Sequence, residues 1–143
     1  MEITEKDEKL IGLLRVDGRL SVSEIARRLF SSRTAAQMRL QKLIRNGVIR
    51  GFSVKLSSKY EQSRVRALVM IKFPPPLRAG IEQALGGINQ ITSLYSISGG
   101  FDLAAVVSTG SMSELDEILD KIGCLDGIDE TMSSIILATK IDR

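Results

Sequence analysis

The sequence predicts an α+β protein made of two modules: a basic helical module, followed by a module with the element order βαββαβ. Two observations support this prediction. Apolar residues recur at helical spacing up to about residue 46, whereas from residue 64 onward alternating strand patterns flank helical ones. Charge is also divided, because residues 1–62 hold 13 Lys or Arg and 7 Asp or Glu, whereas residues 63–143 hold 7 and 10. The modules therefore carry net charges of +6 and −3 and are expected to suit different partners.

The composition excludes several classes of enzyme and metal site. The chain of 143 residues is 43% hydrophobic and 26% charged, as in ordinary globular proteins. It has no histidine and one cysteine, Cys124, so we expect no Ser-His-Asp triad, no Cys-His dyad, no catalytic residue, no metal and no cofactor. No apolar run is long enough for a bilayer, and Met1–Glu5 is too acidic for a secretory leader, so we expect a cytoplasmic protein with no membrane partner.

Two capping boxes mark the first two expected helices. Thr4 with Asp7, and Ser21 with Glu24, have the spacing at which a hydroxyl and a carboxylate satisfy the free amides of a helix start. Asp17-Gly18 between them is a turn signal. The one-sided apolar stripes that follow the two starts are Leu10, Ile11 and Leu14, then Val22, Ile25, Ala26 and Leu29.

A third helix is expected from the N-cap Ser32 to about Asn46, with Gly47 as C-cap. The connection at Phe30-Ser31 is tight, and three short helices so joined predict a helix-turn-helix whose third helix enters the major groove of DNA. The expected core stripe of this helix is Ala36, Leu40, Leu43 and Ile44.

The face opposite that stripe is polar, long-armed and basic, which indicates double-stranded DNA as a partner. Arg can contact guanine and Gln adenine, whereas lysine and the arginines of the second helix suit phosphates. Arg39 lies beside the stripe, where it can brace the fold or contact phosphate. A small helical bundle with a solvated charged face is the alternative. The candidate DNA-binding residues are Arg27, Arg28, Ser32, Arg33, Thr34, Gln37, Met38, Gln41, Lys42 and Arg45.

The middle of the chain reads as a connector. Residues 48–56 are β-rich with rough alternation, and residues 57–63 are polar, which predicts a strand and then a linker. Such a strand acts either as a wing of the helical module or pairs with another chain, and the sequence does not choose between these. We expect a helix-turn-helix domain over 1–50, a hinge strand and linker over 51–63, and a second domain over 64–143.

The second domain begins with strand, helix, strand, strand. Residues 64–73 alternate in hydropathy and end at Pro74–Pro76, and residues 77–88 have helical spacing. Strands are expected over 91–98 and 101–108, joined by Gly99-Gly100 as a two-residue hairpin turn.

A helix and a strand complete the second domain. Ser111 and Glu114 have capping-box spacing before an apolar stripe that reaches Ile122, and a final strand is expected over about 130–140. The order βαββαβ predicts a ferredoxin-like domain, with one four-stranded antiparallel sheet and both helices on one side. The second face of this sheet is also expected to be apolar and needs a cover, for which a two-fold related copy is the simplest solution. The alternative is a monomer with an exposed apolar sheet. The expected dimer-interface residues are Leu68, Met70, Val106 and Ile136.

Three segments, 23–29, 39–52 and 95–103, resemble the Lrp/AsnC (leucine-responsive regulatory protein) family of transcription regulators. The resemblance implies a DNA-binding helix-turn-helix joined to a ferredoxin-like domain that senses a small molecule, usually an amino acid. It also implies dimers that assemble into tetramers or octamers, with the strand over 49–56 pairing across the dimer.

The resemblance also implies effector contacts between the sensing domains of neighbouring subunits. Glycine amides can bind a carboxylate, Asp102 can accept from an ammonium group, and serine hydroxyls can complete the shell, although Gly99-Gly100 alone is also a plain turn. Proteins of similar architecture include siroheme decarboxylases, so such an enzyme is the alternative function, although this chain lacks the histidine implicated there. The candidate effector-binding residues are Ser98, Gly99, Gly100, Asp102, Ser133 and Ser134.

Overall fold

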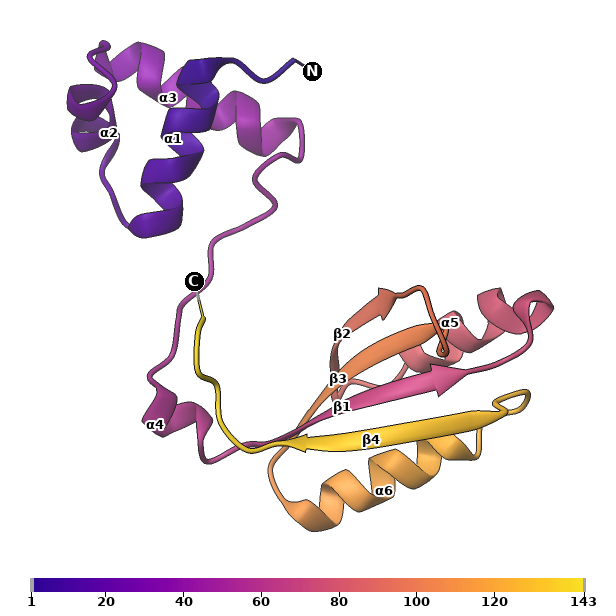
Figure 1. Ribbon diagram of the computed structural model, residues 1–143. Coiled ribbons are helices and arrows are strands. Elements are labelled where there is room, and N and C mark those ends of the chain that lie inside the picture. The colour runs from indigo at the N-terminus through magenta and orange to yellow at the C-terminus, as the bar shows by residue number, and fades with distance from the viewer. Residues whose placement is uncertain (1, 143) are drawn as a thin grey trace. The chain divides into compact units, whose positions relative to one another are not determined.

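The computed structural model describes residues 2–142, which form two compact units (Figure 1). The first unit ends at Lys55 and the second begins at Leu56. No helix within residues 2–142 combines the length and the apolar character needed to cross a membrane.

The first unit is the expected set of three helices: α1 (Glu5–Val16), α2 (Val22–Arg28) and α3 (Arg33–Arg45). Hydroxyls of Thr4, Ser21 and Ser32 accept from backbone amides at the three helix starts, as local capping chemistry predicts. Asn46 ends α3, and Gly47 follows with a φ of +71°, a conformation that glycine adopts without a Cβ clash.

Small and branched apolar side chains from all three helices form the core of the first unit. Leu10 and Leu43 are fully buried, and Ala36 lets α3 approach its neighbours closely. Ile44, expected in the core stripe, is instead half-exposed, because it lies at the edge of the stripe beyond Leu43. The buried residues of this cluster are Leu10, Ile25, Ala26, Leu29, Ala36 and Leu43.

The expected strand over 48–56 is not formed within the chain. Residues 50–57 have no regular structure, and no strand precedes Val65 in the part of the chain from residue 2, so the helix-turn-helix has no wing of its own. A strand needs a partner for its backbone groups, and the first unit offers none. The polar stretch expected as a linker instead contains the short helix α4 (Ser58–Glu61), capped by Ser57.

The second unit is the expected ferredoxin-like domain. Its elements are β1 (Val65–Lys72), the 3₁₀ helix η1 (Pro75–Leu77), α5 (Arg78–Gly86), β2 (Ile91–Ser96), β3 (Leu103–Thr109), α6 (Met112–Gly123) and β4 (Glu130–Ile136). The strands form one antiparallel sheet in the order β2-β3-β1-β4 (Figure 1). Both helices pack on one face, where alternate residues of β1 and β3 form the core with Ile81, Leu85, Leu115, Ile118 and Ile122.

Strand ends differ from the expectation at two places. Ile97 donates to the Asp102 carbonyl at 3.1 Å, so four residues, 98–101, form the turn between β2 and β3, not the two glycines alone. Gly99 has a φ of +112°, which explains one glycine there. β4 ends at Ile136 rather than near residue 140, because β1, its one neighbour in the sheet, begins at Val65.

Candidate functional site

The exposed face of α3 carries a positive charge with no acidic residue in the helix. The sequence of α3 holds Arg33, Arg39, Lys42 and Arg45 and neither Asp nor Glu. All ten side chains expected to face DNA are exposed, so the structure brings them to the surface of α2 and α3. The outer side of α3 borders an open hollow of about 550 Å³. The residues that line it are Ala35, Met38, Arg39, Gln41, Lys42 and Arg45.

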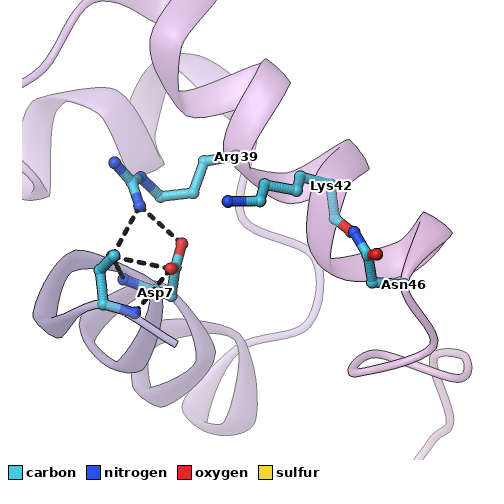
Figure 2. A network of polar contacts seen from close by, with 5 residues as sticks. Asp7, Arg39, Lys42 and Asn46 are labelled. Atoms are coloured by element: carbon cyan, nitrogen blue, oxygen red, sulfur yellow. Dashed lines mark hydrogen bonds and ion pairs between the residues drawn. The ribbon is translucent and has the colours of Figure 1, made fainter. Parts of the chain in front are cut away.

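Arg39 belongs to the fold rather than to this exposed face. Its Nη1 donates to Asp7 Oδ1 at 2.6 Å and to the Thr4 hydroxyl at 3.0 Å, so it ties α3 to the start of α1 (Figure 2). Asp7 is fully buried, whereas Lys42 lies one turn further along α3 and is exposed. Of the two roles that the sequence left open for Arg39, the structure shows the bracing one.

The buried Asp7 carboxylate is charged because three donors surround it. Burial by itself would raise the pKa of Asp7, but the Thr4 amide at 2.8 Å, the Thr4 hydroxyl at 2.7 Å and the Arg39 guanidinium lower it to about 2. A buried charge with such partners holds a specific geometry, because separating them would leave the charge unpaired in the core. The position of α3 on α1 is thereby fixed.

Glu24 links the two arginines of α2. Its carboxylate accepts from Arg27 Nε at 3.0 Å and from Arg28 Nε at 2.9 Å. Hydrogen bonds from Arg27 and then Arg28 lower the pKa of Glu24 to about 2, although partial burial acts in the opposite direction. The reciprocal capping bond expected from Glu24 to Ser21 is replaced by these ion pairs, because arginines three and four residues later lie on the same side of the helix.

The candidate effector residues around the β2–β3 turn are held by the sheet. The Asp102 amide donates to the Ile71 carbonyl at 2.9 Å, and the Asp102 carboxylate accepts from the Phe73 amide at 3.0 Å. Arg78 lies 4.0 Å from the other Asp102 oxygen and 5.3 Å from the centre of the Phe73 ring. One carboxylate oxygen of Asp102 is therefore engaged by the fold, and the second faces a cation.

The two candidate serines of β4 lie apart from that turn and from each other. Ser133 pairs with Val69 on the face covered by helices, whereas Ser134 pairs with Leu68 on the open face. β1 lies between these serines and Asp102, whose amide donates to Ile71 of β1. A single chain does not gather the six candidate residues into one pocket.

The open face of the sheet holds a row of large side chains. Cross-strand pairing places Tyr95, Ala104, Met70 and Met132 side by side, and Val106 and Leu68 form part of the adjacent row. Leu68, Tyr95 and Met132 are large and partly exposed. The four residues expected at a dimer interface, Leu68, Met70, Val106 and Ile136, thus share this face. Tyr95 and Met132 lie on it as well and were not expected there, although the period of their strands could have indicated them.

Comparison with protein families identifies both units. The model of the AsnC-type helix-turn-helix domain matches residues 3–44, and that of the Lrp/AsnC ligand binding domain matches residues 66–143. The chain belongs to the Lrp/AsnC family. This Lrp/AsnC protein is 30% identical to an HTH-type transcriptional regulator of Pyrococcus furiosus, over 96% of this chain and 94% of that one. It is 31% identical to the HTH-type transcriptional regulator LysM of Sulfurisphaera tokodaii, over 95% of this chain and 96% of that one.

Solved structures of transcriptional regulators have the same fold. AsnC of E. coli matches with a TM-score of 0.88 and 22% identity, over 100% of this chain and 97% of that one. LrpA of Mycobacterium tuberculosis matches with a TM-score of 0.83 and 28% identity, over 97% of this chain and 95% of that one. A Neisseria meningitidis transcriptional regulator, solved as an L-Met complex, matches with a TM-score of 0.85 and 20% identity, over 99% of this chain and 94% of that one.

These comparisons identify the protein as a DNA-binding transcriptional regulator of the Lrp/AsnC family. Its relatives are transcriptional regulators, which does not favour the alternative of a siroheme-decarboxylase-like enzyme.

Proposed function

We propose that this regulator binds a pseudo-palindromic DNA site as a dimer, through the exposed face of α3, and that a small effector such as an amino acid modulates the binding. The observation that carries the proposal is the surface of α2 and α3. It presents ten exposed side chains, most of them polar or basic, and α3 itself contains no acidic residue. Duplex DNA is the polyanion whose major groove accepts one such helix.

Different residues of that surface have different roles in the proposal. Gln37, Gln41 and Arg45 have the reach and the hydrogen-bonding groups for base edges. Ser32, Arg33, Thr34 and Met38 lie toward the beginning of α3, where recognition helices usually contact DNA, and Thr34 and Met38 offer apolar groups as well. Arg27, Arg28 and Lys42 would contact phosphates, which position the protein without reading sequence.

Dimer formation through the open sheet face supplies the second recognition helix. The apolar side chains of β1, β3 and β4 would meet their two-fold equivalents, which removes them from water. The segment 51–63 is the proposed connector, and residues 49–56 would pair as a strand with the same segment of the partner, since they find no partner within their own unit. Further association of dimers into tetramers or octamers in the cytoplasm is part of the same proposal.

The effector is proposed to bind beside the β2–β3 turn, at a boundary between subunits. Backbone amides of Gly99 and Gly100 would bind a carboxylate, and Ser98 and the Asp102 oxygen that faces Arg78 would bind the amino end. Ser133 and Ser134 would come from a neighbouring subunit, because in one chain β1 lies between them and the turn and they lie on opposite faces of the sheet. The L-Met complex of the Neisseria meningitidis regulator supports an amino acid as the class of ligand.

A mobility-shift titration with the DNA upstream of the protein's own gene, repeated with each common amino acid, tests this function. Gln41→Ala and Arg45→Ala should each weaken specific binding about 5- to 100-fold, as expected for loss of one good base contact, without changing the oligomer. Arg15→Ala is the control, because it removes one positive charge from α1 as Arg45→Ala does from α3. Equal affinity of the Gln41 and Arg45 variants and the unchanged protein would show that α3 does not read the site.

A further inference from the structure

The turn between α2 and α3 contains a backbone conformation that its residue disfavours. Among residues 2–142, Phe30 is the non-glycine residue with a positive φ, at +50°. The Ser31 amide donates to the Ala26 carbonyl at 3.0 Å across it, which closes the end of α2. Glycine, and less often asparagine, usually occupies this position of a helix end, because a Cβ clashes with the backbone in the left-handed region.

The Phe30 side chain contributes little to the stability of the fold. It is 95% exposed, so its ring loses almost no contact with water when the chain folds. Both the backbone and the ring of this residue are thus less favourable in the isolated first unit than glycine would be. Strained residues of this kind concentrate at functional sites, where a partner supplies the missing contacts.

The neighbours of Phe30 indicate which partner this is. Arg27 and Arg28 precede it at the end of α2, and Ser32 and Arg33 follow it at the start of α3, all exposed. The ring therefore lies between the side chains proposed to contact phosphates and those at the start of the proposed recognition helix. A protein partner with an apolar patch has no such reason to approach three guanidinium groups, whereas a duplex carries phosphates beside apolar groups.

We propose that Phe30 is an apolar DNA contact, whose ring packs on a thymine methyl group or a deoxyribose at the edge of the half-site. The inference rests on the proposed function, because it requires that α2 and α3 lie on duplex DNA. A phenylalanine ring cannot bond to a phosphate, but contact with the thymine C5 methyl group is one of the recognised modes of base readout. The residue has a φ of +50° and its ring is almost fully exposed, so the fold itself makes little use of the ring.

Phe30→Gly separates this role from folding. The variant relieves the left-handed strain, so its thermal midpoint should rise, while its affinity for the specific duplex should fall about 3- to 10-fold through loss of the apolar contact. Phe30→Tyr, which keeps the ring, should bind within about twofold of the unchanged protein. Val16→Ala, which truncates an apolar residue of α1 that is 89% exposed, is the matched control and should bind normally.

The duplex supplies a second arm of the experiment. Replacing thymines of the site by uracil one at a time removes single methyl groups; a loss seen with the unchanged protein but not with Phe30→Gly assigns the methyl contact, and no such loss assigns the deoxyribose. Unchanged affinity of Phe30→Gly, or an equal loss in Phe30→Tyr, would overturn the inference while leaving the proposed function intact. Absence of specific DNA binding by the unchanged protein would instead overturn the proposed function.

Discussion

At the residue scale, single charges decide which side chains are available to DNA. Arg39 is basic and lies on α3, yet its bonds to Asp7 and Thr4 assign it to the fold, whereas Lys42 three residues later remains exposed (Figure 2). The buried Asp7 is the acceptor in that arrangement, and it has to be ionised for the ion pair to exist. Helix α3 is therefore attached to α1 through an acid-sensitive contact.

Acid should weaken the first unit over a defined range of pH. The pKa of Asp7 is lowered from 3.8 to about 2, so this group contributes stability that is present above pH 4 and lost as the pH falls toward 2. Asp7→Asn should lower the free energy of unfolding at pH 7 by about 2 kcal/mol and flatten its dependence on pH in that range. Urea unfolding followed by far-ultraviolet circular dichroism between pH 7 and 2 measures both. The exposed Asp126→Asn is the control, and an equally steep acid response in Asp7→Asn would contradict the assignment.

At the element scale, the helices and the sheet could be predicted because their signals are local. The capping hydroxyls of Thr4, Ser21 and Ser32 and the period of the apolar residues lie within the elements that they define. The strand over 48–56 could not be placed, since a strand depends on a partner that the sequence of the segment does not specify. The exposed α2–α3 surface followed from helical geometry, whereas the engagement of Asp102 depends on tertiary contacts with β1 and Phe73.

Element α2 offers a prediction about charge. Glu24 neutralises part of the Arg27 and Arg28 charge through two ion pairs on one helix. Glu24→Gln should raise nonspecific DNA affinity and make the slope of log affinity against log salt steeper by up to about one, because an additional cation becomes available to phosphate. Fluorescence anisotropy titrations over a series of salt concentrations measure the slope. Glu5→Gln, which breaks a similar pair with Lys9 on α1, should leave it unchanged; an identical slope in both variants would show that Glu24 does not control these arginines.

At the scale of the whole molecule, the basic first unit and the apolar open face of the second unit support one function. In the proposed complex, one α3 helix would contact only half of a pseudo-palindromic site, and a two-fold axis through paired sheets would provide a second one, with half-sites about one helical turn or a multiple apart. The residues that would form this contact, Leu68, Met70, Val106 and Ile136, lie on the sheet face opposite the one that α5 and α6 cover.

A charge at the centre of the open face should therefore separate the subunits and weaken DNA binding together. Met70→Glu places a carboxylate in the row with Tyr95, Ala104 and Met132, where its two-fold equivalent would also lie near an apolar surface, so pairing would require dehydration of two charges. Analytical ultracentrifugation should then show the 15.7 kDa single chain, and affinity for the specific duplex should fall at least about tenfold, because one half-site contact is lost. Met112→Glu replaces a half-exposed methionine at the start of α6, on the helix side of the sheet, and should change neither property. A Met70→Glu protein that sediments as the unchanged one would mean that the open face is covered in some other way than by its own copy.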